Sequence, residues 1–218
     1  MDQHEQQAMP GTPRRPTPAR LSSLFERMAA EGEGPITVAE IRDALGDRGL
    51  ATLLIFFAMV NLIPLPPPSS AVLGIPLLII AAQMVYGSTS VWLPKRILAV
   101  TLTRAQFRSA MDRIVPWLTR LEKYIRPRYW PFWPRQGERV VGTIALFLAL
   151  VVTLPIPLGN WFPAFSITLL GFALTERDGV TLAAGAAAGL FALLIIGLVI
   201  GSAGVALGFV WSHMDAIW

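Results

Sequence analysis

The chain has 218 residues, of which 54% are hydrophobic and only 15% are charged, and its formal net charge at pH 7 is +4. Soluble domains carry a charge on roughly a quarter of their residues, so this composition argues against a soluble globule. There is no cysteine, which excludes disulfides, thiol chemistry and thiolate metal sites. The only histidines, His4 and His213, lie in the terminal regions, and we therefore expect neither a metal centre nor a cofactor.

The charged residues are segregated along the chain. Residues 49–94, 140–175 and 179–214 contain none, and each block is long enough to enter a bilayer. Residues 88–139 carry 11 lysines and arginines against three acidic residues. A basic segment between apolar blocks is typical of the cytoplasmic face of a membrane protein. We therefore expect an all-α, polytopic helical membrane protein whose partner is the lipid bilayer rather than nucleic acid.

The start of the chain differs from the rest. Residues 1–19 are polar and rich in proline, which predicts a disordered tail, and residues 20–218 are predicted to form a single membrane domain.

Two short amphipathic helices are expected before the first apolar block, at residues 20–31 and 37–46. In the second, Thr37 and Glu40 have the spacing of a capping box, and Gly46 is a plausible C-terminal cap. We expect both helices to lie on a surface rather than to span a membrane.

Prolines interrupt two pairs of apolar segments, 49–63 with 71–86 and 140–154 with 161–175. A helix over the 15 residues of the first segment is about 22 Å long, whereas the hydrocarbon core is about 30 Å thick, and the other three segments are about equally short. Two short helices joined by a proline break are expected of a re-entrant hairpin or a broken transmembrane helix. The alternative is an ordinary turn between two thin spanning helices, and the sequence leaves both open.

A longer amphipathic helix is predicted over residues 103–126, in the basic section. Its apolar residues repeat at steps of four and three and form one stripe: Phe107, Met111, Ile114, Leu118, Leu121 and Ile125. Pro116 is expected to kink this helix. Residues 126–135 then mix aromatic rings with arginines, which favours an anchor at the membrane–water interface.

The chain repeats itself. Residues 47–66 align without a gap on residues 138–157, so that Arg48 falls on Arg139. The same alignment places Pro64 and Pro66 on Pro155 and Pro157. We therefore predict an internal duplication with repeats at about 36–90 and 138–179 and a connector at about 91–137. The two halves are either parallel or inverted.

The last apolar segment, residues 180–211, has 32 residues and no charge. As one helix it would be about 48 Å long, and two shorter helices parting near residues 201–204 are equally allowed. Its glycines lie four residues apart in three pairs: Gly185 and Gly189, Gly197 and Gly201, Gly204 and Gly208. Such spacing lets helices approach closely, either in a homodimer or within the chain's own bundle.

Several stretches have a recognisable order: "GDRG" (46–49), "NLIPLPPPSSAVLGIPLLIIAAQ" (61–83), "WLPKR" (92–96), "RPR" (126–128), "LPIPLGNWFPAFSI" (154–167) and "RDG" (177–179). With these residues the chain resembles the ExoD family of bacterial exopolysaccharide-synthesis proteins from about residue 20 to about 210. The resemblance implies a multi-pass protein of the bacterial inner membrane that is linked to exopolysaccharide production and to growth at alkaline pH. It implies no particular molecular activity.

Candidate site residues fall into two groups. A substrate or ion pathway is indicated by residues beside the breaks and in the charged loop: Asn61, Pro64, Pro66, Ser69, Gln83, Pro155, Pro157, Asn160, Arg177 and Asp178. Contacts with lipid phosphates or other anions are indicated by Arg48, Arg126, Arg128 and Arg139. The structural alternatives are helix packing for the polar residues, capping for the charged loop, and side chains that snorkel to the interface for the arginines.

The preferred hypothesis is transport or ion homeostasis through the proline-broken hairpins. One alternative is a non-transporting partner of the polysaccharide synthesis or export proteins, and another is a protein that handles a lipid-linked carrier. We expect no enzymatic activity, because the apolar segments contain no nucleophile–base pair and no acid pair.

Overall fold

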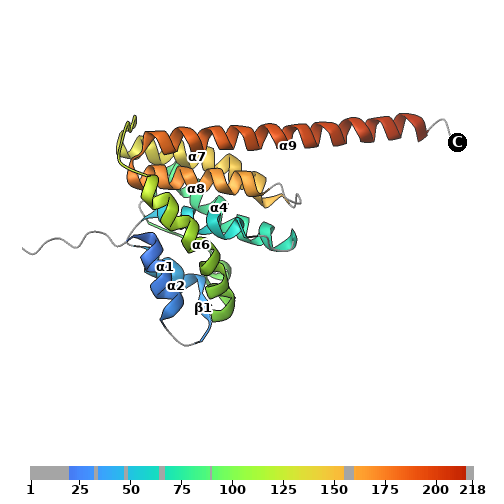
Figure 1. Cartoon of the computed structure of the whole chain (residues 1–218). Coiled ribbons are helices and arrows are strands. Elements are labelled where there is room, and N and C mark those ends of the chain that lie inside the picture. The colour runs from blue at the N-terminus through green and yellow to red at the C-terminus, as the bar shows by residue number, and fades with distance from the viewer. Residues whose placement is uncertain are drawn as a thin grey trace, which may run out of the picture.

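The computed structural model describes residues 20–31, 34–46, 49–63, 67–88, 90–154 and 160–214, and within them it is almost entirely helical (Figure 1). The exception is a short antiparallel pairing of β1 (Ile36–Thr37) with β2 (Thr101–Leu102). The prediction of a helical protein is therefore confirmed.

The amphipathic helices form a lobe beside the main bundle. This lobe contains α1 (Leu21–Ala30), α2 (Val38–Gly46), the short α5 (Lys95–Leu98) and α6 (Arg104–Tyr124). Helix α1 packs on α6, and both α2 and α6 contact α3 of the bundle. The lobe therefore covers one side of the bundle.

The sequence pattern accounts for how these helices begin and pack. The predicted capping box of α2 is present: the Thr37 amide donates to Glu40 Oε2 and the Glu40 amide donates to Thr37 Oγ1, both at 3.1 Å. Thr103 and Gln106 form a second capping box at the start of α6, which the sequence reading did not identify. The predicted stripe of α6 faces inward, and the helix continues through Pro116 without interruption.

Two helical hairpins form the bundle. The first consists of α3 (Leu50–Asn61) and α4 (Pro67–Tyr86), and the second of α7 (Pro134–Thr153) and α8 (Trp161–Glu176). Helix α3 packs against α8 of the other hairpin, and α4 packs against α7. Because neighbouring helices surround them, nearly every side chain of α3 is buried, as are the side chains of α8 from Pro163 to Ala173 except the half-buried Phe165.

The prediction of four short helices is right for α3 and α8, which have 12 and 16 residues, and wrong for α4 and α7, which have 20 each. At 1.5 Å per residue, α4 and α7 are about 30 Å long. Helix α4 starts early because Pro67 and Pro68 lie in its first turn, where a missing N–H is tolerated. Helix α7 likewise begins at a proline, Pro134, within the basic section.

Both hairpins point the same way. A β-carbon at Gly74, early in α4, would lie 2.7 Å from Thr153 Cγ2 at the end of α7. At the opposite end, a β-carbon at Gly142 in α7 would lie 2.6 Å from Met84 Cβ, late in α4. We call the end where α3 ends and α8 begins the tip, and the end where α9 begins the base. The two hairpins are therefore parallel to one another and not inverted.

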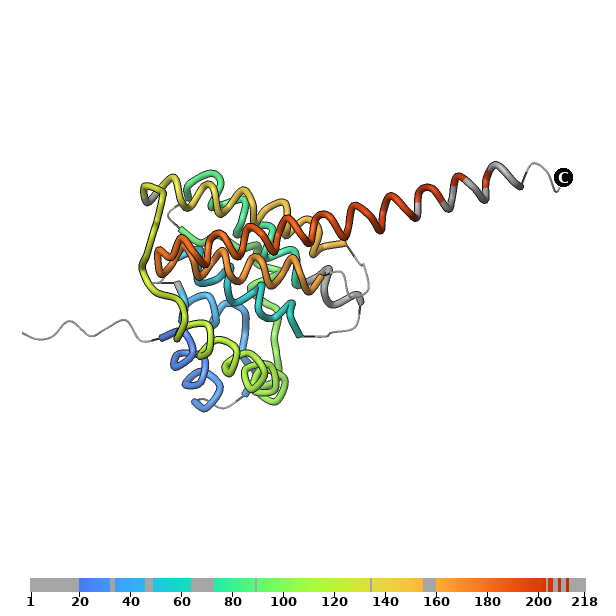
Figure 2. The backbone as a smooth tube through the Cα atoms, turned by 45° about the horizontal axis from the view of Figure 1, so that its top comes forward, coloured from blue at the N-terminus to red at the C-terminus, as the bar shows by residue number. Residues whose placement is uncertain are grey.

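Helix α9 (Gly179–Met214) is a single helix of 36 residues, so the alternative of two shorter helices is wrong. It runs along α8 from the base to the tip and then continues well beyond the bundle (Figures 1 and 2). Of its side chains that the structure describes, the last buried one is Ile196, and Val199, Ile200 and Val205 are exposed. Its distal half therefore presents apolar surface to the surroundings.

Within the described residues, two helices are long and apolar enough to cross a membrane, over Arg135–Thr153 and Gly179–Ser202. Only 39% and 22% of these stretches are buried within the protein, whereas a core helix of a soluble protein is mostly buried. Much of their apolar surface therefore faces outward.

Candidate functional site

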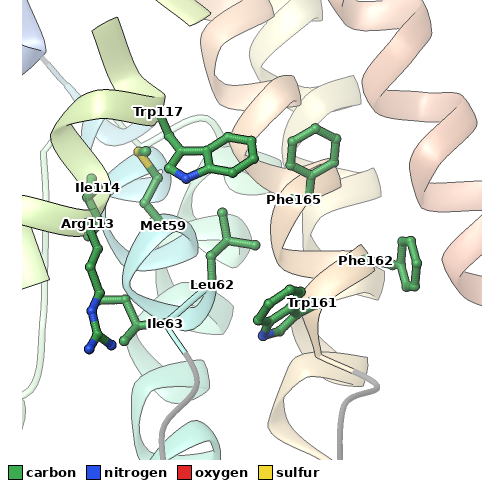
Figure 3. A pocket seen from close by; sticks show the side chains of 9 residues that line it. All are labelled: Met59, Leu62, Ile63, Arg113, Ile114, Trp117, Trp161, Phe162 and Phe165. Atoms are coloured by element: carbon green, nitrogen blue, oxygen red, sulfur yellow. The ribbon is translucent and has the colours of Figure 1, made fainter. Parts of the chain in front are cut away.

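A cavity of about 490 Å³ lies at the tip of the bundle, and we call it the tip cavity (Figure 3). It is lined by Met59, Leu62, Ile63, Arg113, Ile114, Trp117, Trp161, Phe162 and Phe165. Its volume lies in the range of small-molecule binding sites.

Three chain segments meet at the tip cavity. Helix α3 ends at Asn61 and places Leu62 and Ile63 on one wall, and α8 starts at Trp161 on another. Trp117 of α6 points toward Phe165 of α8 across the top of the view (Figure 3). Phe162 points away toward α9, where its ring lies 5.5 Å from that of Phe191. The cavity thus lies where the bundle meets the lobe.

Among the described residues that line the tip cavity, Arg113 is the only charged one, and it extends beside Ile63 (Figure 3). Other arginines of α6 are engaged: Arg104 donates to Met28 O at 2.6 Å, and Arg108 donates to Ala29 O at 2.7 Å. Arg113 has no ion pair and no hydrogen bond with any residue in the described part of the chain. Its guanidinium is therefore available to a ligand.

Two predicted site residues, Asn61 and Asn160, directly precede residues that line the cavity. They are only 5% and 8% exposed, and neither Oδ1 atom accepts a hydrogen bond from the residues that the structure describes. The Asn61 amide nitrogen does have partners, donating to Phe57 O at 2.8 Å and to Leu73 O at 3.4 Å. A buried acceptor without a donor is costly, so these two oxygens are unusual features of the residues beside the cavity.

Gln83 lies away from the tip and has a local role. Its Nε2 donates to Trp92 O and its Oε1 accepts from the Trp92 amide, both at 2.7 Å. The side chain thus holds the segment that follows α4 against the end of that helix.

Several of the predicted pathway and anion-binding residues fall outside the described part of the chain. These residues are Arg48, Pro64, Pro66, Pro155 and Pro157. Ser69 falls within α4, but its side chain is likewise outside the description.

Asp178 is at the base, far along α8 and α9 from the tip cavity, and forms what we call the base clamp. Its carboxylate is fully buried and accepts from Arg128 Nε at 3.0 Å and from Thr181 Oγ1 at 2.8 Å. It also accepts from the backbone amides of Val180 at 3.0 Å and Arg126 at 3.4 Å. The carboxylate thereby caps α9 and ties it to the segment that precedes α7.

The electrostatics of the base clamp follow from these bonds. Burial acts to raise the pKa of Asp178, but the hydrogen bonds from Arg128, Thr181 and the two amides outweigh it. The pKa is lowered from 3.8 to about 2. The carboxylate is therefore ionised and fully engaged at neutral pH.

Three of the four predicted anion-binding arginines, Arg126, Arg128 and Arg139, lie at the base. The Arg128 side chain is 43% exposed although it pairs with Asp178, and Arg126 contributes its backbone amide to the same carboxylate. Arg139 lies beside Gly87, where a β-carbon would be 3.5 Å from its guanidinium. The exposed rings of Tyr129 and Trp133 accompany these cations. The base thus exposes cations together with aromatic rings, whereas the described side chains that line the tip cavity carry one cation, Arg113.

The sequence reading did not identify the tip cavity. Arg113 and Trp117 are four residues apart on α6 and so lie on one helix face, which was an available signal. The aromatic start of α8, Trp161 to Phe165, was a second one. What the sequence did not contain was the contact that brings these segments together.

The fold and the site define a nearly all-helical protein with two helices long and apolar enough to cross a membrane and an apolar cavity at the tip of its hairpins. Residues 21–198 match the family described as "Exopolysaccharide synthesis, ExoD". The chain belongs to the ExoD family, which is linked to exopolysaccharide synthesis.

Individual relatives agree with this assignment. An uncharacterized protein of Synechocystis sp. is 30% identical over 172 residues, which cover 77% of this chain and 81% of that protein. Protein ExoD of Rhizobium meliloti is 28% identical over 173 residues, covering 76% of this chain and 71% of that protein. No solved structure matches the chain.

Proposed function

We propose that this protein serves exopolysaccharide production by binding a long-chain amphiphile in the tip cavity, as a handler of a lipid-linked carrier. The observation that carries this proposal is the cavity itself, whose lining is aliphatic and aromatic except for one arginine. An apolar chain would bury its surface there, and burial of apolar surface is the main source of affinity in such sites.

The proposal places the protein in the inner membrane as a multi-pass protein. The outward apolar surfaces of α7 and α9 are suited to lipid contact. The cluster of exposed arginines and aromatic rings at the base is suited to the cytoplasmic interface. This orientation directs the tip, and with it the cavity, toward the interior of the bilayer.

We also retain the internal duplication as part of this proposal. The arrangement supports it, because the first helix of each hairpin packs against the second helix of the other. A close glycine contact occurs in both crossings: Gly142 against Met84, and Gly171 against Ile55. A duplication whose two hairpins are related by a pseudo-two-fold axis parallel to the helices would produce this arrangement.

The test is to fill the cavity. Leu62→Trp should abolish binding of a fluorescent long-chain amphiphile to the purified protein and lower exopolysaccharide yield in a complemented deletion strain. Leu190→Trp, on the exposed face of α9, is the matched control and should change neither. Unchanged binding and unchanged polysaccharide in the Leu62→Trp variant would refute the proposal.

Transport or ion homeostasis, with tolerance of alkaline pH as its outcome, is the second candidate. The observation that favours it is the pair of unsatisfied amide oxygens of Asn61 and Asn160 near the tip. In proteoliposomes, Asn61→Leu and Asn160→Leu should then abolish cation or proton uptake shown by the unaltered protein. Absence of uptake by the unaltered protein would exclude this candidate.

A third candidate is a membrane partner of the synthesis or export proteins, or a homodimer, assembled through the distal half of α9. It is favoured by the open space around Gly197, Gly201, Gly204 and Gly208, where a β-carbon would meet no heavy atom within 4 Å in the described part of the chain. Cross-linking through single cysteines on this face would report such a partner.

A further inference from the structure

We infer that the tip cavity selects a long-chain lipid phosphate, with its apolar chain against the aromatic wall and its phosphate on the guanidinium of Arg113. This inference rests on the proposed function and names the class of headgroup that the cavity takes. It assigns Arg113 a role in specificity that the sequence pattern alone did not indicate.

The hydrogen-bonding groups of the lining are of one kind. The side chains that line the cavity offer the five N–H donors of Arg113 and the indole N–H groups of Trp117 and Trp161. Apart from the weak thioether of Met59, these side chains include no acceptor. A headgroup rich in acceptors therefore satisfies the cavity, whereas an ammonium or another cation finds no ligand among these side chains.

The positive charge of Arg113 has no acidic partner among the described residues. The neighbouring acid on α6, Asp112, lines a different groove together with Glu26 and Arg108, on the side that faces α1. The guanidinium of Arg113 consequently has an apolar surrounding on one side and no carboxylate partner among the described residues. A negative charge brought to this position would form a charge-assisted pair in a poorly hydrated place, where such pairs are strongest.

Phosphate is the anion that fits both the geometry and the proposed role. A guanidinium can bind two phosphate oxygens at once and leave the third for an indole N–H. A long-chain lipid phosphate also provides the apolar surface that the remaining eight lining residues would cover. The cavity thus matches both halves of such a molecule.

The test compares three ligands on the full-length protein in detergent by isothermal titration: farnesyl phosphate, farnesol and palmitate. We expect farnesyl phosphate to bind at least about tenfold more tightly than farnesol, since a hydrogen bond to a charged group contributes about that factor. Arg113→Gln should remove most of this preference while farnesol binding stays unchanged. Arg120→Gln, two turns further along α6 and outside the cavity lining, is the matched control and should retain the preference.

The outcomes separate the inference from the proposed function. Equal affinity for farnesyl phosphate and farnesol, or a preference that survives in Arg113→Gln, would overturn the headgroup assignment and leave the amphiphile site in place. Palmitate binding as tightly as farnesyl phosphate would overturn the choice of phosphate. If Leu62→Trp binds all three ligands like the unaltered protein, the tip cavity is not the site and the proposed function fails with the inference.

Discussion

Asp178 follows α8, and its buried carboxylate joins the start of α9 to the segment at Arg126 and Arg128. The residues around it are conformationally restricted: Tyr129 and Arg177 have φ values of 51° and 53°, in the left-handed region that side chains rarely adopt. Gly179 packs so closely on the Tyr129 carbonyl that a β-carbon would collide with it. The network that holds these residues therefore stabilises a connection that the backbone alone disfavours.

We predict that Asp178→Asn lowers the free energy of unfolding by about 2 kcal/mol at neutral pH. Because the pKa of Asp178 is lower in the folded protein than its ordinary 3.8, its contribution is complete above pH 3.8 and is lost as the pH falls toward about 2. The melting temperature of the unaltered protein should therefore fall more steeply than that of Asp178→Asn between neutral pH and about pH 3.

Asp43→Asn is the control for this measurement. Asp43 pairs with Arg42 at the surface and its side chain is 66% exposed, so its loss should have little effect. Equal melting temperatures of Asp178→Asn and the unaltered protein at neutral pH would show that the base clamp does not contribute to stability.

Contacts of single residues across the chain could be predicted from the sequence only in part. The "RDG" stretch at 177–179 was recognised as a candidate, but its partners Arg128 and Thr181 became visible only in the structure, where the 125–129 segment reaches α9. Asn61 and Asn160 were candidates because they are polar residues beside apolar segments, and the structure shows that both are buried. Arg113 was not singled out, because nothing in a basic amphipathic helix distinguishes one arginine from the next.

Helix α9 has two halves with different surroundings: the first half is packed and the second half is exposed. Its first half packs on α8, where a β-carbon at Gly189 would lie 2.8 Å from Ser166 Oγ. That hydroxyl donates to Gly185 O at 2.7 Å, so the glycines and the serine form one close contact. Its second half contacts no other described element.

A matched pair of substitutions distinguishes these surfaces. Gly189→Ala should lower stability by about 1–3 kcal/mol, because the added methyl group overpacks the contact with Ser166. Gly197→Ala should leave stability unchanged or raise it by up to about 1 kcal/mol, because alanine favours the helix and the position is open. Thermal unfolding in detergent is the measurement. A loss of stability in Gly197→Ala would instead show that a second molecule packs on the distal half.

Periodicity explains which elements could be predicted. The helices α2 and α6 have one apolar face, so their burial pattern and caps follow from spacing. Helices α3 and α8 are apolar all round, so the sequence gives their existence but not the neighbour that each face contacts. Their pairing across the two hairpins, and the extension of α4 into the proline run, needed the structure.

The whole molecule is elongated: the bundle and the lobe beside it lie at one end, and α9 extends away from them (Figure 2). The sequence predicted two repeated halves and left open whether they are parallel or inverted. Contacts between residues far apart in the chain, such as Gly74 with Thr153, decide this in favour of the parallel arrangement. The tip cavity exists only because of it, since inverted hairpins would separate the end of α3 from the start of α8.

We predict the orientation of the molecule in the membrane from this asymmetry. Single cysteines at Arg135, at the start of α7, and at Glu176, at the end of α8, both lie at the base and should react with a membrane-impermeant thiol reagent only from the cytoplasmic side. A cysteine at Ser202, on the distal half of α9, should be protected or react from the opposite side. The chain has no native cysteine, so labelling has no background. Labelling of all three positions from one side would contradict the spanning orientation.

The length of α9 has a consequence for the lipids around the protein. Its 36 residues correspond to about 54 Å, whereas the hydrocarbon core is about 30 Å thick, and no charged side chain occurs along it. Such hydrophobic mismatch is relieved by tilting or by local thickening of the bilayer. In a thin membrane the distal half of α9 would tilt, and because α9 packs along α8, this tilt would change the packing at the tip of the bundle. The acyl-chain length of the surrounding lipids would then influence the shape of the tip cavity.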